Sequence, residues 1–324
     1  MLTNDLHAFM YSKVKPINVL TYDTFLACLE DRQGKFNTGN YESIGGYKAL
    51  IDVDTGQPYS VVRDTYQPID NAEINTNISN LCREAGLNPN IKAYNHNNGA
   101  AMAVRYQFKE KGRFIRQGPN STKKTFLCPE IWAYNSYDGT QTARLTGAVY
   151  DSACENGIAF KNTINFYKLK HTKNNADMAY IVGSELDGYF DRLSQQIDLL
   201  ESWANIEINY MDTIRLLEKI KGVSFLDKSK PAKRQAEKIG DKIHYQVYGE
   251  IRDRGQENIN LWSIVSAVTN YSTLREDKGS NGHGISTNSL NVGVSRQENV
   301  ASWLTNIVAP FAENRLNNVA GGLV

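Results

Sequence analysis

Cysteine is scarce in this chain, and its few thiols lie far apart. The 324 residues include only Cys28, Cys82, Cys128 and Cys154, and no two of them form a Cys-x-x-Cys pair. This spacing excludes the cysteine patterns of a disulfide framework and of a thiolate zinc site. It favours a reducing cytoplasm as the location of the protein.

Long apolar runs are also lacking. The longest run is far shorter than the roughly 20 residues that a membrane-spanning helix requires. The first residues, MLTNDLHAFMYSK, contain no basic segment followed by an apolar one, which a secretory signal would need. We therefore expect neither membrane insertion nor secretion.

Signatures of catalysis are missing as well. No nucleophile motif surrounds Cys154 or His171, and no second histidine or acidic cluster accompanies His96 at metal-ligand spacing. The glycine-rich segment from Ser280 to Gly284 is not followed by the Gly-Lys-Ser/Thr of a phosphate-binding loop. Carboxylates at a spacing suited to two-metal chemistry are lacking too. The sequence predicts a protein that is not an enzyme and that needs no metal or cofactor.

Alternation of apolar and polar residues dominates the first half of the chain after a weakly patterned beginning. We expect a short helix at Tyr22–Leu29 within an N-terminal arm. The β-rich part that follows should contain one helix and three pairs of strands. A helix should begin at Asp70 or Asn71 and end at Gly86, where a left-handed cap is wanted. The expected strands are Tyr47–Val53 with Pro58–Val62, Asn90–Tyr94 with Ala101–Phe108, and Glu130–Asn135 with Thr142–Tyr150. One antiparallel sheet of about five or six strands is the simplest assembly.

The pattern becomes helical from about Ala176. Apolar residues recur at helical spacing from Leu186 to Ile208, and further helices are expected at 233–242, 260–271 and 300–318. The segment 279–293 reads as a loop. The sequence thus predicts an α+β fold: an antiparallel sheet with a packed helix, followed by a helical half. The expected divisions are an arm at 1–45, a basic β-rich domain at 46–175 and an acidic helical region at 176–324.

Positive charge is concentrated in one stretch. From Asn88 to Lys173 there are thirteen Lys and Arg against five Asp and Glu, whereas the whole chain has a net charge of only +1. Twelve aromatic residues lie in the same stretch. Cations can hold phosphates while rings stack on bases, at about 1 to 3 kcal/mol per base. This combination is typical of proteins that bind single-stranded nucleic acid.

The predicted binding residues come from two basic segments, 109–124 and 160–173, and from the strands near them. A solvated loop and buried core aromatics are the alternative interpretation of the same residues. The residues predicted to contact nucleic acid are Lys92, Arg105, Lys109, Lys111, Arg113, Phe114, Arg116, Lys123, Lys124, Trp132, Tyr134, Tyr137, Arg144, Lys161, Tyr167, Lys168, Lys170, His171 and Lys173.

Several strings between roughly Gly46 and Leu316 occur in a distinctive order and spacing. They are Asp54-Thr-Gly-x-Pro58, Tyr66-Gln-Pro-Ile-Asp-Asn-Ala-Glu73, Asn135-Ser-Tyr-Asp-Gly-Thr140, Cys154-Glu-Asn156, Lys170-His-Thr172, and Trp262 with Ala267-Val-Thr-x-Tyr271. Together they resemble a domain family known as phage/plasmid-like protein. The chain differs from the usual family pattern at Tyr137, where His is common, and at Lys170, where Arg is common. The resemblance implies a mobile-element protein acting in the cytoplasm of the host cell, and it says little about activity.

The order hairpin, helix and further strands also resembles the core of recombination annealing proteins, which bind single-stranded DNA between sheet and helix. This is an analogy of fold, and fold does not fix function. The leading hypothesis is a phage-encoded single-stranded DNA-binding protein for replication, recombination or transcription, with phage replication or transcription proteins and further copies of itself as possible partners. The alternative is a protein-interaction factor that recruits a phage RNA polymerase or inhibits a host system through its acidic helices.

Overall fold

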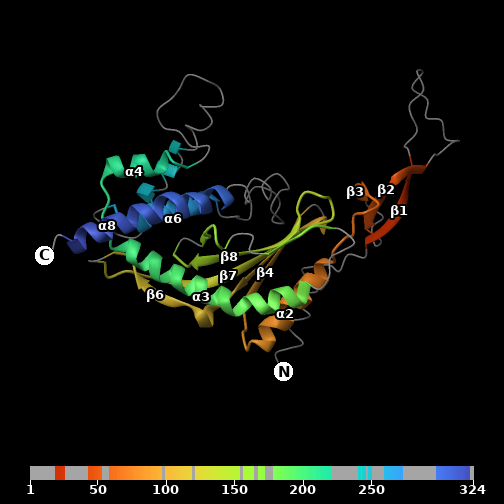
Figure 1. Cartoon of the computed structure of the whole chain (residues 1–324), viewed down its shortest axis with the longest axis horizontal. Coiled ribbons are helices and arrows are strands. Elements are labelled where there is room, and N and C mark those ends of the chain that lie inside the picture. The colour runs from red at the N-terminus through yellow and green to blue at the C-terminus, as the bar shows by residue number, and fades with distance from the viewer. Residues whose placement is uncertain are drawn as a thin grey trace, which may run out of the picture.

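The computed structural model describes residues 19–25, 43–52, 58–96, 99–118, 121–153, 156–163, 167–171, 178–220, 240–241, 243–245, 247–249, 259–272 and 297–321. Two antiparallel sheets and several helices make up these residues (Figure 1). The predicted α+β class is confirmed, with the helices mainly in the C-terminal half.

The smaller sheet has three strands in the order β1-β2-β3. They are β1 (Val19–Phe25), β2 (Ser43–Asp52) and β3 (Pro58–Arg63). The predicted first hairpin is confirmed as β2 and β3. The predicted helix at Tyr22–Leu29 is wrong over Tyr22–Phe25 and otherwise lies outside the described residues. β1, with the sequence VLTYDTF, is rich in β-branched and aromatic residues and pairs along β2, so that strand pairing replaces helix formation.

The larger sheet has seven strands in the order β10-β8-β7-β5-β4, and β6 and β9 pair with β7 and β8. Its strands are β4 (Asn90–His96), β5 (Ala101–Gln107), β6 (Arg113–Arg116), β7 (Lys124–Ser136), β8 (Ala143–Asp151), β9 (Asn156–Ile158) and β10 (Tyr167–Leu169). The predicted second and third strand pairs are therefore confirmed. The prediction of one sheet is wrong, because the β2–β3 hairpin pairs with β1 and not with the larger sheet.

β6 and the first residue of β7 lie in the basic segment 109–124, which was predicted to be a loop. The Gly, Pro, Ser and Lys residues of this segment favour a loop, yet the four residues Arg-Phe-Ile-Arg within it form a short strand that pairs with Lys124–Leu127. Pro129 lies within β7, between its pairings with β6 and with β5. Its carbonyl accepts from the Phe108 amide, so its missing N–H faces the gap where β5 has ended and β6 has not begun.

The helices cover one face of the larger sheet. α2 (Asn71–Glu84) begins at Asp70, whose side chain accepts from the Ala72 amide, and α3 (Met178–Ala204) lies beside it along the sheet (Figure 1). Both predicted helices are confirmed, and Gly86 has the expected positive φ of 67°. Further elements are the short 3-10 helix η2 (Lys109–Lys111), α4 (Tyr210–Leu217), α6 (Leu261–Ser272), the π-helical turn η3 (Leu304–Val308) and α8 (Ala309–Gly321).

The predicted helices at 260–271 and 300–318 are thus confirmed. The predicted loop at 279–293 lies outside the described residues, and so does 233–242 except for the helical residues 240 and 241. No helix in the described ranges is both long enough and apolar enough to cross a membrane.

One large core joins the sheet to the helices. Met102, Val104, Tyr106 and Phe108 all lie in it, as their alternation predicted, together with apolar residues of α2, α3 and α6. The predicted boundary at residue 176 therefore separates two parts of the chain that share one hydrophobic core. The opposite face of the larger sheet has a smaller cluster of its own, formed by Ala101, Ala103, Trp132 and Tyr134.

Candidate nucleic-acid interface

The face of the larger sheet opposite the main core, called the outer face below, carries rings and cations. Strand side chains alternate between faces, so the register assigns every second residue of each strand to it. β7 contributes Lys124, Phe126, Cys128, Glu130, Trp132 and Tyr134 in one continuous row. The neighbouring strands add Lys92, Tyr94, Arg105, Phe114, Arg116, Arg144, Tyr150 and Lys168.

Three pairs of cations stand directly opposite each other on the outer face. Lys92 of β4 is the cross-strand partner of Arg105. Arg116 of β6 faces Lys124. Arg144 of β8 faces Lys168. Like charges at directly opposed positions destabilise a sheet, so this arrangement fits a face that meets an anion.

Aromatic rings lie between these cations. The Tyr94 and Trp132 rings stack with centroids 5.8 Å apart, and Trp132 and Tyr134 stack at 6.0 Å. The Arg105 guanidinium lies 5.6 Å from the Trp132 ring centroid and 5.2 Å from that of Tyr150. Arg144 lies 4.9 Å from the Tyr134 centroid. Such cation–π contacts hold the guanidinium groups flat against the rings.

The outer face has an exposed end and a buried end. At the β6 end, Phe114 is 67% exposed, and Arg116 and Lys124 are exposed beside it. Toward the other end of β7, Trp132 is 2% exposed and Tyr134 1%. We call the exposed Phe114, Arg116 and Lys124, together with the half-buried Phe126, the ribbon. Arg105, Trp132, Tyr134 and Arg144 are called the inner cluster.

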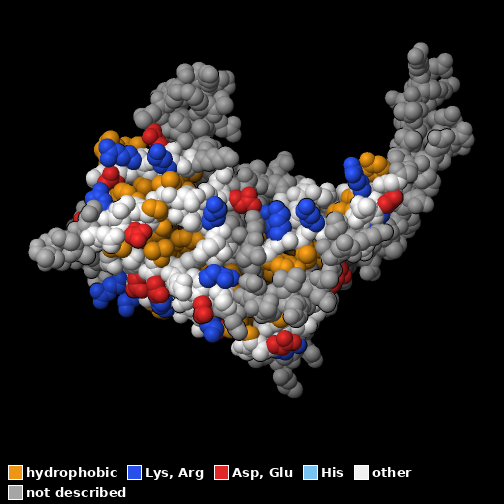
Figure 2. All heavy atoms as spheres, viewed as in Figure 1, with side chains coloured by type: hydrophobic (Ala, Val, Ile, Leu, Met, Phe, Trp, Pro, Cys, Tyr) orange, Lys and Arg blue, Asp and Glu red, His pale blue; other side chains and the backbone are white. Residues whose placement is uncertain are grey.

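Figure 2 shows Lys and Arg side chains gathered with acidic ones at the edge where Figure 1 places β6. The ribbon rings touch each other, since the centroids of Phe114 and Phe126 are 5.2 Å apart. No ion pair links Arg116 or Lys124 to a carboxylate of the described residues. The ribbon can thus offer both charge and an aromatic surface to a ligand without rearrangement.

Glu130 is the one acid in the row along β7, and it is fully buried. The Trp132 indole donates to its Oε1 at 2.8 Å. Burial raises the pKa of the Glu130 carboxyl, whereas the charge of Arg105 acts to lower it. β9, which pairs with the far side of β8, has glycine at position 157, where a Cβ would lie 2.4 Å from Glu130 Oε1. Glu130 therefore holds the Trp132 ring and Arg105 in place from inside the sheet.

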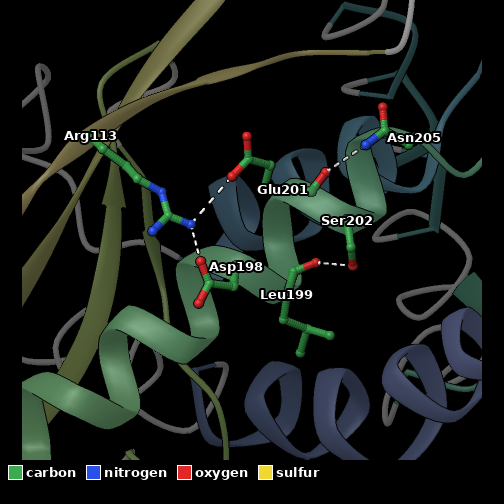
Figure 3. A network of polar contacts seen from close by, with 6 residues as sticks. All are labelled: Arg113, Asp198, Leu199, Glu201, Ser202 and Asn205. Atoms are coloured by element: carbon green, nitrogen blue, oxygen red, sulfur yellow. Dashed lines mark hydrogen bonds and ion pairs between the residues drawn. The ribbon is translucent and has the colours of Figure 1, made fainter.

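Arg113 points away from the outer face. Its guanidinium pairs with Asp198 and, at 3.3 Å, with Glu201, both on α3 (Figure 3). It shares the side of β6 that carries the buried Ile115. Arg113 was predicted to hold phosphate, but here its charge is balanced by two carboxylates and it joins β6 to α3.

Burial separates several other predicted residues from any ligand in this conformation. Arg105, Trp132, Tyr134, Tyr137, Arg144, Tyr167 and His171 are all buried. Contacts between distant segments bury these rings and cations, which alternation along a strand cannot reveal. The exposed residues Lys109, Lys111, Lys123, Lys161 and Lys170 lie off the outer face, and Lys173 lies outside the described residues. The structure thus unites Lys92, Arg105, Phe114, Arg116, Lys124, Trp132, Tyr134, Arg144 and Lys168 on one face, and not the others.

Tyr137 and His171 belong to a junction between the two sheets. The Tyr137 hydroxyl accepts from the Asn71 amide at 2.9 Å, and the Ser60 hydroxyl donates to the Tyr137 carbonyl at 2.7 Å. Tyr66 donates to the Ser136 carbonyl and stacks on His171 with centroids 4.7 Å apart. Three of the strings that carry the family resemblance meet here. Their described residues link β3, α2 and β7, which is a structural role.

Sequence reasoning missed Tyr94, Phe126 and Tyr150 as members of the outer face. The signal that could have found Phe126 is the alternation Lys124, Phe126, Cys128, Glu130, Trp132, Tyr134, which is evident once the strand is started at Lys124. Gln297 and Glu298 were also missed. They contact Tyr134 and Arg144 from a segment more than 150 residues away, and no local pattern marks them.

Within the described ranges no three His, Cys, Asp or Glu side chains gather as a metal site would require. Cys82 and Cys128 are buried free thiols.

The chain belongs to the family described as domain of unknown function (DUF932), whose model matches residues 58–299. This match spans both the larger sheet and the helices that share its core. Comparisons with curated proteins and with solved structures found no match.

Proposed function

We propose that this protein binds single-stranded DNA along the outer face of its larger sheet. The observation that carries the proposal is the set of three opposed cation pairs on that face, Lys92 with Arg105, Arg116 with Lys124, and Arg144 with Lys168. Like charges at opposed positions repel, and a phosphate backbone would neutralise the exposed cations Lys92, Arg116, Lys124 and Lys168. The rings between the pairs supply surfaces on which bases stack.

Binding begins at the ribbon in this proposal. Arg116 and Lys124 hold phosphates, and Phe114 stacks on a base beside them. Lys92 and Lys168, both exposed, extend the positive track to the two sides of the sheet. Contacts of this kind go to the backbone and to ring faces, so they favour strands whose bases are unpaired and carry little sequence preference. The interaction is non-covalent.

The proposed setting is a phage or plasmid protein that acts in the host cytoplasm during replication, recombination or transcription. It rests on the family resemblance of the sequence. The single-stranded intermediates of all three processes offer the ligand that the outer face suits.

A fluorescence titration tests the proposal directly. A labelled oligonucleotide of random sequence is titrated with protein at low and at moderate salt. We expect binding at low salt that weakens steeply as salt rises, because released counterions drive the association. Failure to bind at low salt, or binding that ignores salt, would overturn the proposal. A duplex of the same sequence serves as the control ligand.

A protein-interaction role is the second candidate, and it has an observation of its own. Tyr210, Met211, Tyr245 and Tyr248 are exposed by 50%, 57%, 78% and 50%. The His244 ring lies edge-on to both Tyr210 and Tyr248, at 5.9 and 4.9 Å between centroids. Exposed aromatic groups of this kind are enriched at protein interfaces.

Pull-downs from infected-cell lysate, with and without nuclease, separate the two candidates. Partners that persist after nuclease treatment and are lost in a Tyr245→Ser, Tyr248→Ser variant would favour the second role. Partners that disappear with nuclease would favour DNA binding.

A further inference from the structure

The inner cluster is in contact with a segment from the far end of the chain. Residues 297–303 are helical, and the first two of them lie on the cluster. The Tyr134 hydroxyl donates to Gln297 Oε1 at 3.3 Å. The Arg144 Nη1 lies 3.7 Å from Glu298 Oε1. The Gln297 amide thus contacts the Tyr134 hydroxyl, and the Glu298 carboxylate contacts the Arg144 guanidinium.

The contacts leave the buried cations incompletely satisfied. Arg144 is 6% exposed and Arg105 8%, and the Nε of each guanidinium has no hydrogen-bond partner. Burial lowers the pKa of Arg144, and the Glu298 charge acts in the opposite direction. Unsatisfied buried donors of this kind carry a desolvation cost that a better acceptor would relieve. A DNA phosphate offers two charged acceptor oxygens, as the Glu298 carboxylate does, so it can take the same place on Arg144.

The contacts that Gln297 and Glu298 make with the inner cluster are also weak. The Glu298 side chain is 46% exposed, and its distance to Arg144 is long for an ion pair. Half-exposed pairs of this geometry contribute little to stability. The Gln297 contact at 3.3 Å is likewise at the long end of the range for an O–H donor.

We propose that the segment beginning at Gln297 is a gate over the inner cluster, with Glu298 occupying the place of a DNA phosphate on Arg144. This inference rests on the proposed binding of single-stranded DNA to the outer face. DNA first engages the ribbon, then displaces Gln297 and Glu298 and reaches Arg144, Tyr134 and Trp132. The path follows β7, which carries Lys124 and Phe126 of the ribbon and Trp132 and Tyr134 of the inner cluster on the same face.

The test compares wild type with a Gln297→Ala, Glu298→Gln variant, which removes the Gln297 contact and the negative charge at residue 298 while keeping the size of that side chain. A Glu313→Gln variant is the matched control, since it makes the same charge change at an exposed residue of α8. Affinity for a labelled single-stranded oligonucleotide is measured for all three, with thermal melting to confirm that each is folded. We expect the gate variant to bind about three- to tenfold more tightly and the control to match wild type.

Hydrogen exchange provides the second readout. When the oligonucleotide binds wild type, amides of 297–303 should exchange faster while those of β6 and β7 exchange more slowly. Protection at β6 and β7 with no change at 297–303, together with equal affinity of the gate variant and wild type, would overturn the gate and leave DNA binding at the ribbon intact. Absence of binding by both proteins at low salt would overturn the proposed function itself, and the gate with it.

Discussion

The ring of Tyr189 fills the space that a side chain on Gly147 would need. A Cβ atom built on Gly147 would lie 1.5 Å from the Tyr189 hydroxyl oxygen. That hydroxyl donates to the Glu130 carbonyl at 3.0 Å, so α3 is attached to β7 across β8. The side chain of Glu130 lies on the outer face, so this hydrogen bond links α3 to a residue that lies beside the outer-face cations.

Replacing Gly147 with Ala should therefore destabilise the fold. We expect the free energy of unfolding to fall by about 1–3 kcal/mol, since the new methyl group must displace the buried Tyr189 ring. Urea denaturation followed by circular dichroism measures it. Gly188→Ala is the matched control, because its nearest neighbour is the Arg192 side chain at 3.8 Å. That change should stabilise by roughly 0.5–1 kcal/mol through helix propensity. Equal effects of the two substitutions would contradict the close packing.

Removing the ribbon cations should weaken DNA binding and its salt dependence together. An Arg116→Ala, Lys124→Ala variant loses two phosphate contacts, so the slope of log K against log salt should shrink by about 1.4. A Lys109→Ala, Lys111→Ala variant has the same change in charge within the same basic segment but away from the outer face. Its slope should change much less. If the salt slope falls by the same amount in both variants, DNA binding depends on the overall charge of the segment and not on the outer face.

Phe114 should contribute to binding through its ring alone. Phe114→Ala is expected to cost about 1–3 kcal/mol of binding free energy, the value of one stacked base, and to leave the salt slope unchanged. Phe114→Tyr keeps a ring and should bind like wild type. Titrations at two salt concentrations distinguish this effect from loss of charge, and a Phe114→Ala variant with wild-type affinity would show that the ring faces only solvent.

Arg113 should contribute little to the free energy of unfolding and little to DNA binding. Its partners Asp198 and Glu201 have side chains 63% and 46% exposed, so the ion pairs are screened by water. Arg113→Ala should lower the free energy of unfolding by less than about 1 kcal/mol. It should also weaken oligonucleotide binding less than Arg116→Ala on the same strand. A larger loss of affinity than that of Arg116→Ala would mean that Arg113 leaves α3 to meet the ligand.

His171 should make the fold sensitive to mild acid. Burial lowers the pKa of its imidazole in the folded protein, and hydrogen bonds with the Gln67 and Gln141 backbone offset this only in part. Below about pH 6.5 the unfolded chain gains a proton that the folded protein resists, so stability is lost as pH falls through that value. His171→Phe keeps the stack on Tyr66 without the titrating group. Urea denaturation at pH 7.5 and 5.5 should show a smaller acid loss for the variant, and an identical loss would contradict the assignment.

Local residue patterns were sufficient for much of the fold. The Asp70 cap and Gly86 delimit α2, the alternation of Met102, Val104 and Tyr106 places β5 against the core, and the helical period marks α3. These features depend on neighbours within a few residues, where capping and side-chain periodicity act. The concentration of cations and rings between Asn88 and Lys173 was likewise evident without coordinates.

The tertiary structure alone decided which of those cations and rings share a surface. The pairs Lys92 with Arg105 and Arg144 with Lys168 depend on the register of hydrogen bonds between strands, and a slip of one residue would send each side chain to the opposite face. Burial of Trp132 and Tyr134, the turning of Arg113 toward α3 and the arrival of Glu298 at Arg144 depend on contacts between distant segments. Sequence determined the chemical groups and the local elements; the long-range pairing that buries or exposes those groups is fixed only when the whole chain packs.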